Sequence, residues 1–154
     1  MREVELHRNP GQQKNAKEQI ERARQEKQLA VQRQRDDALL RTYTDEREID
    51  DSRERNIALP EQAIAGLQLR LSQSRASLQG LRKQTETYAA RGEVVPPGLN
   101  EDIAEEKKEI QRIERDIERY EQQIVSIRER YDDDNRRFRE LKGTKDEAPQ
   151  TANP

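Results

Sequence analysis

Large apolar residues recur at alternating intervals of three and four along two long segments of the chain, which is the pattern of a heptad repeat. The first segment covers residues 45–90 and the second covers residues 100–142. Polar or charged residues occupy most other positions, so each segment predicts a long helix with one narrow apolar stripe, called the seam below. The predicted seam residues are Ile64, Leu67, Leu71, Leu78, Leu81, Tyr88, Ile103, Ile110, Ile113, Ile117, Tyr120, Ile124 and Ile127.

The connection at residues 91–99 cannot continue a helix, because it combines two consecutive prolines with two glycines. A connection this short forces the second helix back along the first. We therefore expect an all-α protein with a long antiparallel coiled-coil helical hairpin over residues 44–143. Asn100 is expected to cap the second helix and Gly143 to end it.

Antiparallel pairing of the two seams predicts which residues face one another. Leu71 is expected opposite Tyr120, and Leu78 opposite Ile113. On the flanks we expect Arg75 near Glu114, Glu61 near Arg128, and an unfavourable approach of Arg82 to Lys107.

The open end of the hairpin is expected to be its weaker end. The facing pairs there are Pro60 with Tyr131, Ile57 with Asp134, and Arg53 with Phe138. A proline inside a helix removes a backbone hydrogen bond and costs ~3 kcal/mol, so we expect a kink or break just before Pro60. A homodimer that forms a four-helix bundle, or a protein partner docked on the hairpin, would add the missing stability.

Residues 12–42 are rich in glutamine, alanine and charged residues, which are good helix formers but leave little apolar surface to bury. We predict a charged, exposed N-terminal helix over this range. Residues 1–11 are expected to be flexible, and residues 144–154 to form a disordered tail.

The composition narrows the class of protein. Charged residues make up 40% of the chain and hydrophobic residues only 30%, which argues against a compact, enzyme-like globule. No apolar run is long enough for a transmembrane segment. The chain has no cysteine, so it offers neither a disulfide nor a thiolate ligand.

The residues that could carry chemistry are few. His7 is the single histidine and has no neighbouring partner for a metal site or a catalytic pair. The run Asp132-Asp133-Asp134-Asn135 lacks the spacing and the glycine of a calcium loop, and a solvated helix face explains it better. The sequence therefore predicts a protein that is not an enzyme and that has no catalytic residue, metal, cofactor or small-molecule substrate.

Two surfaces are candidates for binding a partner. Basic and acidic residues are interleaved along the N-terminal helix, and the helix has no aromatic residue that could stack on nucleobases. A nucleic-acid partner is therefore disfavoured. The tip of the hairpin is the better candidate, because exposed apolar residues often mark contact sites. Its residues are Val94, Val95, Pro96, Pro97 and Leu99. The interpretation we favour, however, is that Val94, Val95 and Leu99 fold back and close the last layer of the seam near Tyr88 and Ile103.

Three segments resemble a group of uncharacterised proteobacterial envelope proteins of the gammaproteobacterial type. They are residues 35–49 (RDDALLRTYTDEREI), residues 91–96 (RGEVVP), and residues 128–132 (RERYD) with 138–143 (FRELKG). In that group a signal peptide and a small domain of unknown function precede a charged coiled coil. The resemblance spans roughly residues 12–143 and implies a periplasmic or envelope location. This chain shows no signal peptide, so a cytoplasmic location is the alternative.

Together these features predict a structural coiled-coil protein that acts as a spacer or protein–protein interaction module of the bacterial cell envelope. The first alternative is a holdase-like or adaptor hairpin that binds clients through its apolar tip. The second is a coiled coil associated with nucleic acid.

Overall fold

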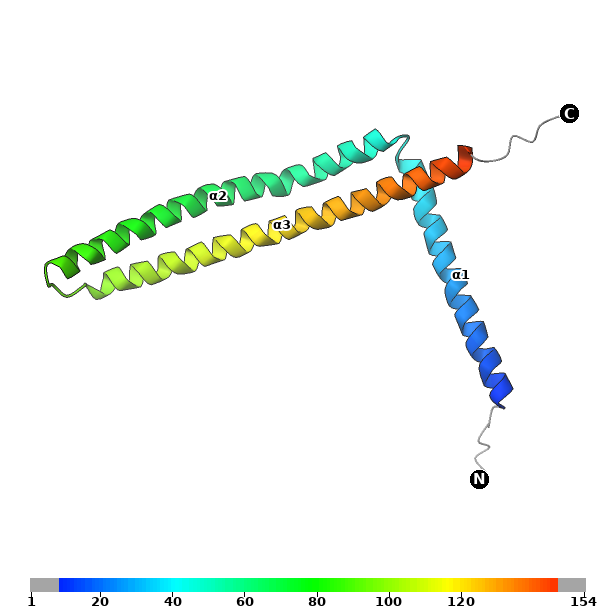
Figure 1. The fold of residues 1–154 in the computed structure, drawn as a ribbon, viewed down its shortest axis with the longest axis horizontal. Coiled ribbons are helices and arrows are strands. Elements are labelled where there is room, and N and C mark those ends of the chain that lie inside the picture. Colours follow the sequence, from blue (N-terminus) through cyan, green and yellow to red (C-terminus); the bar gives the residue numbers. More distant parts are fainter. Residues whose placement is uncertain (1–8, 147–154) are drawn as a thin grey trace, which may run out of the picture. The chain divides into compact units, whose positions relative to one another are not determined.

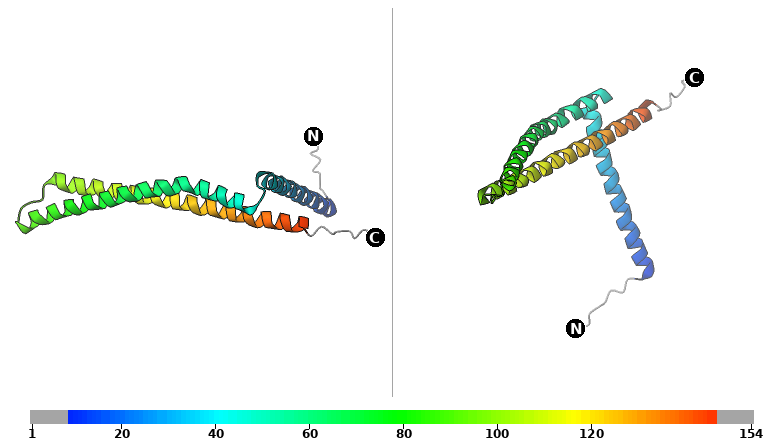
Figure 2. Two further views of the ribbon diagram at one scale, coloured as in Figure 1. Left: turned by 90° about the horizontal axis from the view of Figure 1, so that it is seen from above. Right: turned by 60° about the vertical axis from the view of Figure 1, so that its left-hand side comes forward.

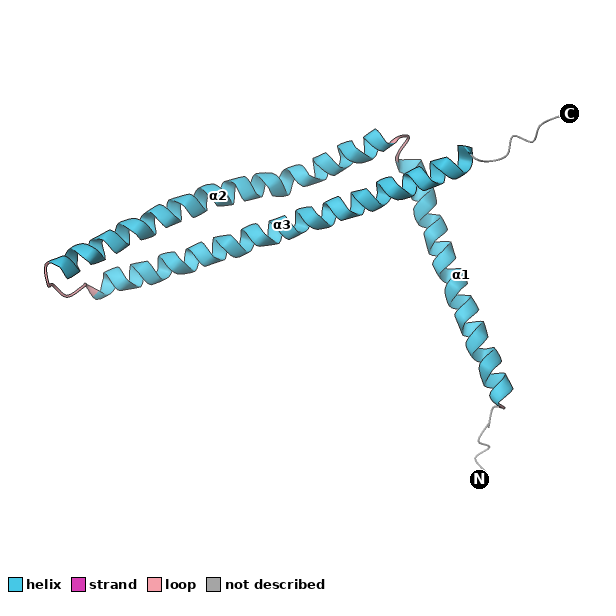
Figure 3. Cartoon of the chain, viewed as in Figure 1, coloured by secondary structure: helices cyan, strands magenta, loops and turns pink. Residues whose placement is uncertain are grey.

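The structure is a computed structural model that describes residues 9–146, with side chains described for residues 9–143. Its helices are α1 (Pro10–Thr42), α2 (Glu46–Ala90) and α3 (Pro97–Asp146) (Figure 1). The described residues contain only these helices and the connections between them (Figure 3). The predicted all-α class is thus confirmed. None of these helices, as far as they are described, combines the length and apolar character that a membrane crossing needs.

Two helices begin earlier than the sequence predicted. The side chain of Asn9 accepts a hydrogen bond from the Gly11 amide at 3.5 Å, so α1 begins at Pro10 and not at residue 12. α3 begins at Pro97, three residues before the expected cap at Asn100. Proline suits the first position of a helix, because its fixed φ is helical and its missing N–H would have no intrahelical partner there.

The predicted end of the second helix at Gly143 is wrong, because α3 continues to Asp146. A glycine ends a helix when it adopts a left-handed conformation, and Gly92 is the only described residue with positive φ. The first three residues of the predicted tail are therefore helical. The rest of that tail, and residues 1–8 of the predicted flexible start, lie outside the described residues.

The chain divides into two compact units. The first contains α1 and the C-terminal part of α3 from Arg136 onward, and the second contains residues 47–135. Within the second unit α2 and α3 lie side by side and run in opposite directions, as the views in Figures 1 and 2 agree. Ile49, Ile57, Leu71, Leu78, Leu99, Ile113 and Tyr131 are the buried hydrophobic residues of this unit.

The predicted break at Pro60 is wrong. α2 is one continuous helix from Glu46 to Ala90 with Pro60 inside it, and the Pro60 side chain is buried. Burial of the proline ring offsets part of the cost of the lost backbone hydrogen bond. In the second unit α2 bows gently along its length instead of separating into two pieces (Figure 2).

Candidate functional site: the tip connection and the helix pair that carries it

The turn after α2 is set by Gly92. Its φ of 68° is left-handed, a conformation that glycine adopts without strain. The Gly92 amide donates to the Ala89 carbonyl and the Glu93 amide to the Tyr88 carbonyl, both at 3.0 Å. These two bonds form a Schellman motif, which ends the helix and satisfies two of its last carbonyl groups.

The predicted tip residues divide into an anchored set and an exposed set. Leu99 lies in the first turn of α3 and is 9% exposed, and Val95 is half-buried. Val94 is 90% exposed, and Pro96 and Pro97 are also exposed. The tip therefore presents one aliphatic side chain, Val94, on a connection that Leu99 anchors, and the five predicted residues do not act as a single patch.

The thirteen predicted seam residues lie on the inner stripe of α2 and α3. Leu71, Leu78 and Ile113 are buried, and the other ten are half-buried. Partial burial is what a two-helix seam provides, because no third layer covers its edges. Two of the three predicted flanking contacts are confirmed, with Arg75 to Glu114 at 3.2 Å and Glu61 to Arg128 at 3.9 Å.

The open end of the pair is built from polar contacts that the apolar pattern did not predict. The Tyr131 hydroxyl lies 3.1 Å from the Ser52 hydroxyl and accepts a hydrogen bond from the Asn56 amide group. The Asn135 amide donates to Asp50 at 2.9 Å. The signal that could have found these contacts is the presence of short polar residues one position beside the seam on both helices: Ser52, Asn56 and Asn135.

These contacts overturn the expected pairing of the open end. Arg53, expected opposite Phe138, forms a 3.7 Å ion pair with Asp132, and Tyr131 bonds to residues before Pro60. Two contacts, Asp50 to Asn135 and Glu61 to Arg128, bound the same stretch of the pair on both helices. Between them α2 advances eleven residues, from 50 to 61, whereas α3 advances only seven, from 128 to 135. The longer span in α2 corresponds to about one extra helical turn.

The open end, which we expect to be the weaker end, is the better buried one. Ile49 is fully buried, Ile57 is 1% exposed and Tyr131 is 2% exposed. Asn135 is 8% exposed, and its side-chain oxygen has no hydrogen-bond partner among the described residues. Burial raises the pKa of the neighbouring Asp134 carboxyl, because the charged form loses its hydration.

A separate ion pair within the first unit fixes the end of α1. Arg137 donates from Nε and Nη2 to the two carboxylate oxygens of Asp36, at 2.9 and 2.8 Å. These bonds lower the pKa of Asp36, and they and the bond to Glu140 raise the pKa of Arg137. A two-point arginine–carboxylate pair holds both orientation and distance.

The described residues contain no group of three or more carboxylates, histidines or cysteines placed to hold a metal ion. The acidic run at residues 132–135 instead lies along α3, where Asp132 pairs with Arg53 and Asn135 with Asp50. His7 lies outside the described residues. No family model, curated protein or solved structure matches the chain.

Proposed function

We propose that the protein is a structural spacer and protein–protein interaction module in which α2 and α3 form an antiparallel coiled coil. The observation that carries this proposal is the partly buried seam between two helices of about equal length, ending in a connection that exposes Val94. A paired helix is stiffer than a single one, and this pair offers contact residues at its far end. A role without catalysis fits this arrangement, because two helices held by one narrow seam do not enclose a cleft that would shield a reaction from water.

The tip supplies the contact in this proposal. Val94 is small, apolar and exposed, and Pro96 and Pro97 restrict the backbone beside it. A restricted loop loses little conformational entropy on binding, which favours association through a small surface. The same geometry fits an adaptor that holds a client at its tip, the closest alternative.

The test replaces Val94 with a photo-reactive amino acid in the full-length protein and irradiates intact cells. We expect one reproducible cross-linked protein from position 94 and none from Gln79, an exposed residue on α2. The substitution Val94→Ser should then abolish capture by a cross-linker placed at Glu93. Equal capture from positions 94 and 79, or capture unaffected by Val94→Ser, would rule out the tip as the contact.

The envelope location proposed for this module rests on the resemblance of residues 35–49, 91–96 and 128–143. Fractionation of the bacterium that makes the protein tests it directly. Release of the full-length protein with the periplasmic contents supports the location, and retention with cytoplasmic proteins contradicts it without affecting the tip proposal.

A further inference from the structure

One face of α1 carries cations that the described part of the chain leaves unpaired. Arg24, Lys27, Gln28, Val31, Gln32 and Arg35 line a shallow hollow of about 380 Å³ on this helix. No described hydrogen bond or ion pair involves the charged groups of Arg24, Lys27 or Arg35. Lys27 and Arg35 have no acidic residue three or four positions away, so α1 itself cannot neutralise them.

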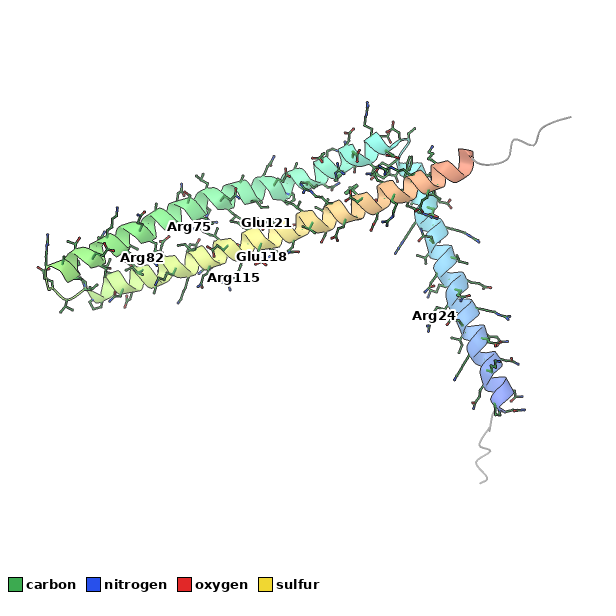
Figure 4. All side chains as sticks on the ribbon, in the orientation of Figure 1. Arg24, Arg75, Arg82, Arg115, Glu118 and Glu121 are labelled. Atoms are coloured by element: carbon green, nitrogen blue, oxygen red, sulfur yellow. The ribbon has the colours of Figure 1, made fainter. Side chains whose placement is uncertain are left out.

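An outer face of α3 carries the opposite charge in the same pattern. Glu118, Glu121 and Glu129 are exposed and have no described ion pair. Glu121 and Glu129 have no basic residue three or four positions away. Figure 4 labels Glu118 and Glu121 on α3, and Arg24 on α1.

The two faces match residue by residue. On α1, Arg24 is followed at intervals of three, four, seven and eleven residues by Lys27, Gln28, Val31 and Arg35. On α3, Glu118 is followed at the same intervals by Glu121, Gln122, Val125 and Glu129, so the kinds of residue match and the charges are opposite. The resulting pairs are Arg24 with Glu118, Lys27 with Glu121, Gln28 with Gln122, Val31 with Val125, and Arg35 with Glu129.

The aliphatic residues at the centre of each face are available for contact. Val31 is 41% exposed and Val125 is 47% exposed. A run of eleven residues spans about 16.5 Å of helix, so two parallel helices can align all five pairs over three turns. One aliphatic residue in this run is too little apolar surface for a membrane, and the matched acids favour a protein partner.

We propose that α1 of one copy binds along α3 of a second copy through these faces, and that the exchange is reciprocal. Each chain carries both faces, so two copies can satisfy one another in a closed, two-fold dimer. The structure pairs Asp36 with Arg137, whereas alignment of the two faces would place residue 36 opposite residue 130. A chain that keeps the Asp36–Arg137 pair cannot also align its own two faces, so we assign the matching face to a second copy.

The experiment uses the full chain and two charge-reversed variants. The first carries Arg24→Glu, Lys27→Glu and Arg35→Glu, and the second carries Glu118→Lys, Glu121→Lys and Glu129→Lys. Analytical ultracentrifugation at low salt should show a dimer for the unaltered chain and monomers for each variant alone. An equal mixture of the two variants should form a dimer, because every altered residue then meets its opposite charge.

Controls separate this interface from a general effect of charge. The variant Arg55→Glu, Arg82→Glu, Lys83→Glu changes the net charge as much as the first variant does, at exposed residues outside both faces, and it should stay dimeric. Raising the salt to several hundred millimolar should weaken the dimer at least about tenfold, because surface charges are then screened. An unaltered chain that stays monomeric at all concentrations, or a mixture of variants that does not associate, overturns the proposal. Far-UV circular dichroism establishes that each variant is as helical as the unaltered chain.

Discussion

Replacing Ile113 with alanine is expected to destabilise the α2–α3 pair by about 2–3 kcal/mol. Ile113 lies in the seam of α3 and is 2% exposed, so almost its whole side chain is shielded from water. The substitution removes the three carbons beyond Cβ, and each costs ~0.8 kcal/mol of burial free energy, or about 2.4 kcal/mol in total. The cavity adds little beyond this, because a two-helix seam borders solvent on both sides and can close.

The assay is thermal and urea unfolding followed by far-UV circular dichroism. In a unit of about 100 residues such as the α2–α3 pair, each kcal/mol shifts Tm by about 4–8 °C, so Ile113→Ala should lower Tm by about 10–20 °C. The matched control is Leu69→Ala on α2, where the side chain is 62% exposed and the expected change is within about 0.5 kcal/mol. Equal shifts for the two variants would refute the assignment of the seam.

Three further predictions test the ends of the helices and the polar contacts. Tyr131→Phe should cost about 1 kcal/mol in urea unfolding, because Ser52 and Asn56 lose a hydrogen-bond partner, whereas Tyr88→Phe should be nearly neutral. Gly92→Ala should lower stability by about 1 kcal/mol through its positive φ, whereas Gly98→Ala in the first turn of α3 should not, and equal effects would contradict the Schellman turn. Because the folded pKa of Asp36 is lowered, its stabilising contribution is complete above the unfolded value near 3.8 and is lost as the pH falls through the folded pKa. Acid titration by NMR should therefore show the Asp36–Arg137 contact opening with a midpoint below the unfolded pKa of Asp36, and an Asp36→Asn variant should lack this transition.

The heptad pattern predicts the buried residues correctly in those parts of the fold where apolar side chains pack between α2 and α3. Leu71, Leu78 and Ile113 are buried as their spacing predicts, because a side chain's position on a helix follows from sequence interval alone. The open end follows a different rule. Ser52, Asn56 and Asn135 pair through hydrogen bonds, and an apolar pattern carries no information about which polar residues will meet.

Contacts distant in sequence were also beyond prediction. Asp36 and Arg137 are separated by 101 residues, and nothing near either residue singles out the other. The tip shows an intermediate case. The turn could be predicted from its glycines and prolines, but the burial of Leu99 depends on where α3 begins, and Pro97 moves that start ahead of Asn100.

The measurement that tests the antiparallel pairing of α2 and α3 most directly is a spin–spin distance between positions 75 and 114. The chain has no cysteine, so Arg75→Cys and Glu114→Cys together place two labels and no others. The residues form a 3.2 Å ion pair, and the labels should therefore show strong dipolar broadening that persists when the labelled protein is diluted with unlabelled protein. Labels that report a separation of tens of ångströms, or broadening that disappears on dilution, would contradict the pairing of the two helices within one chain.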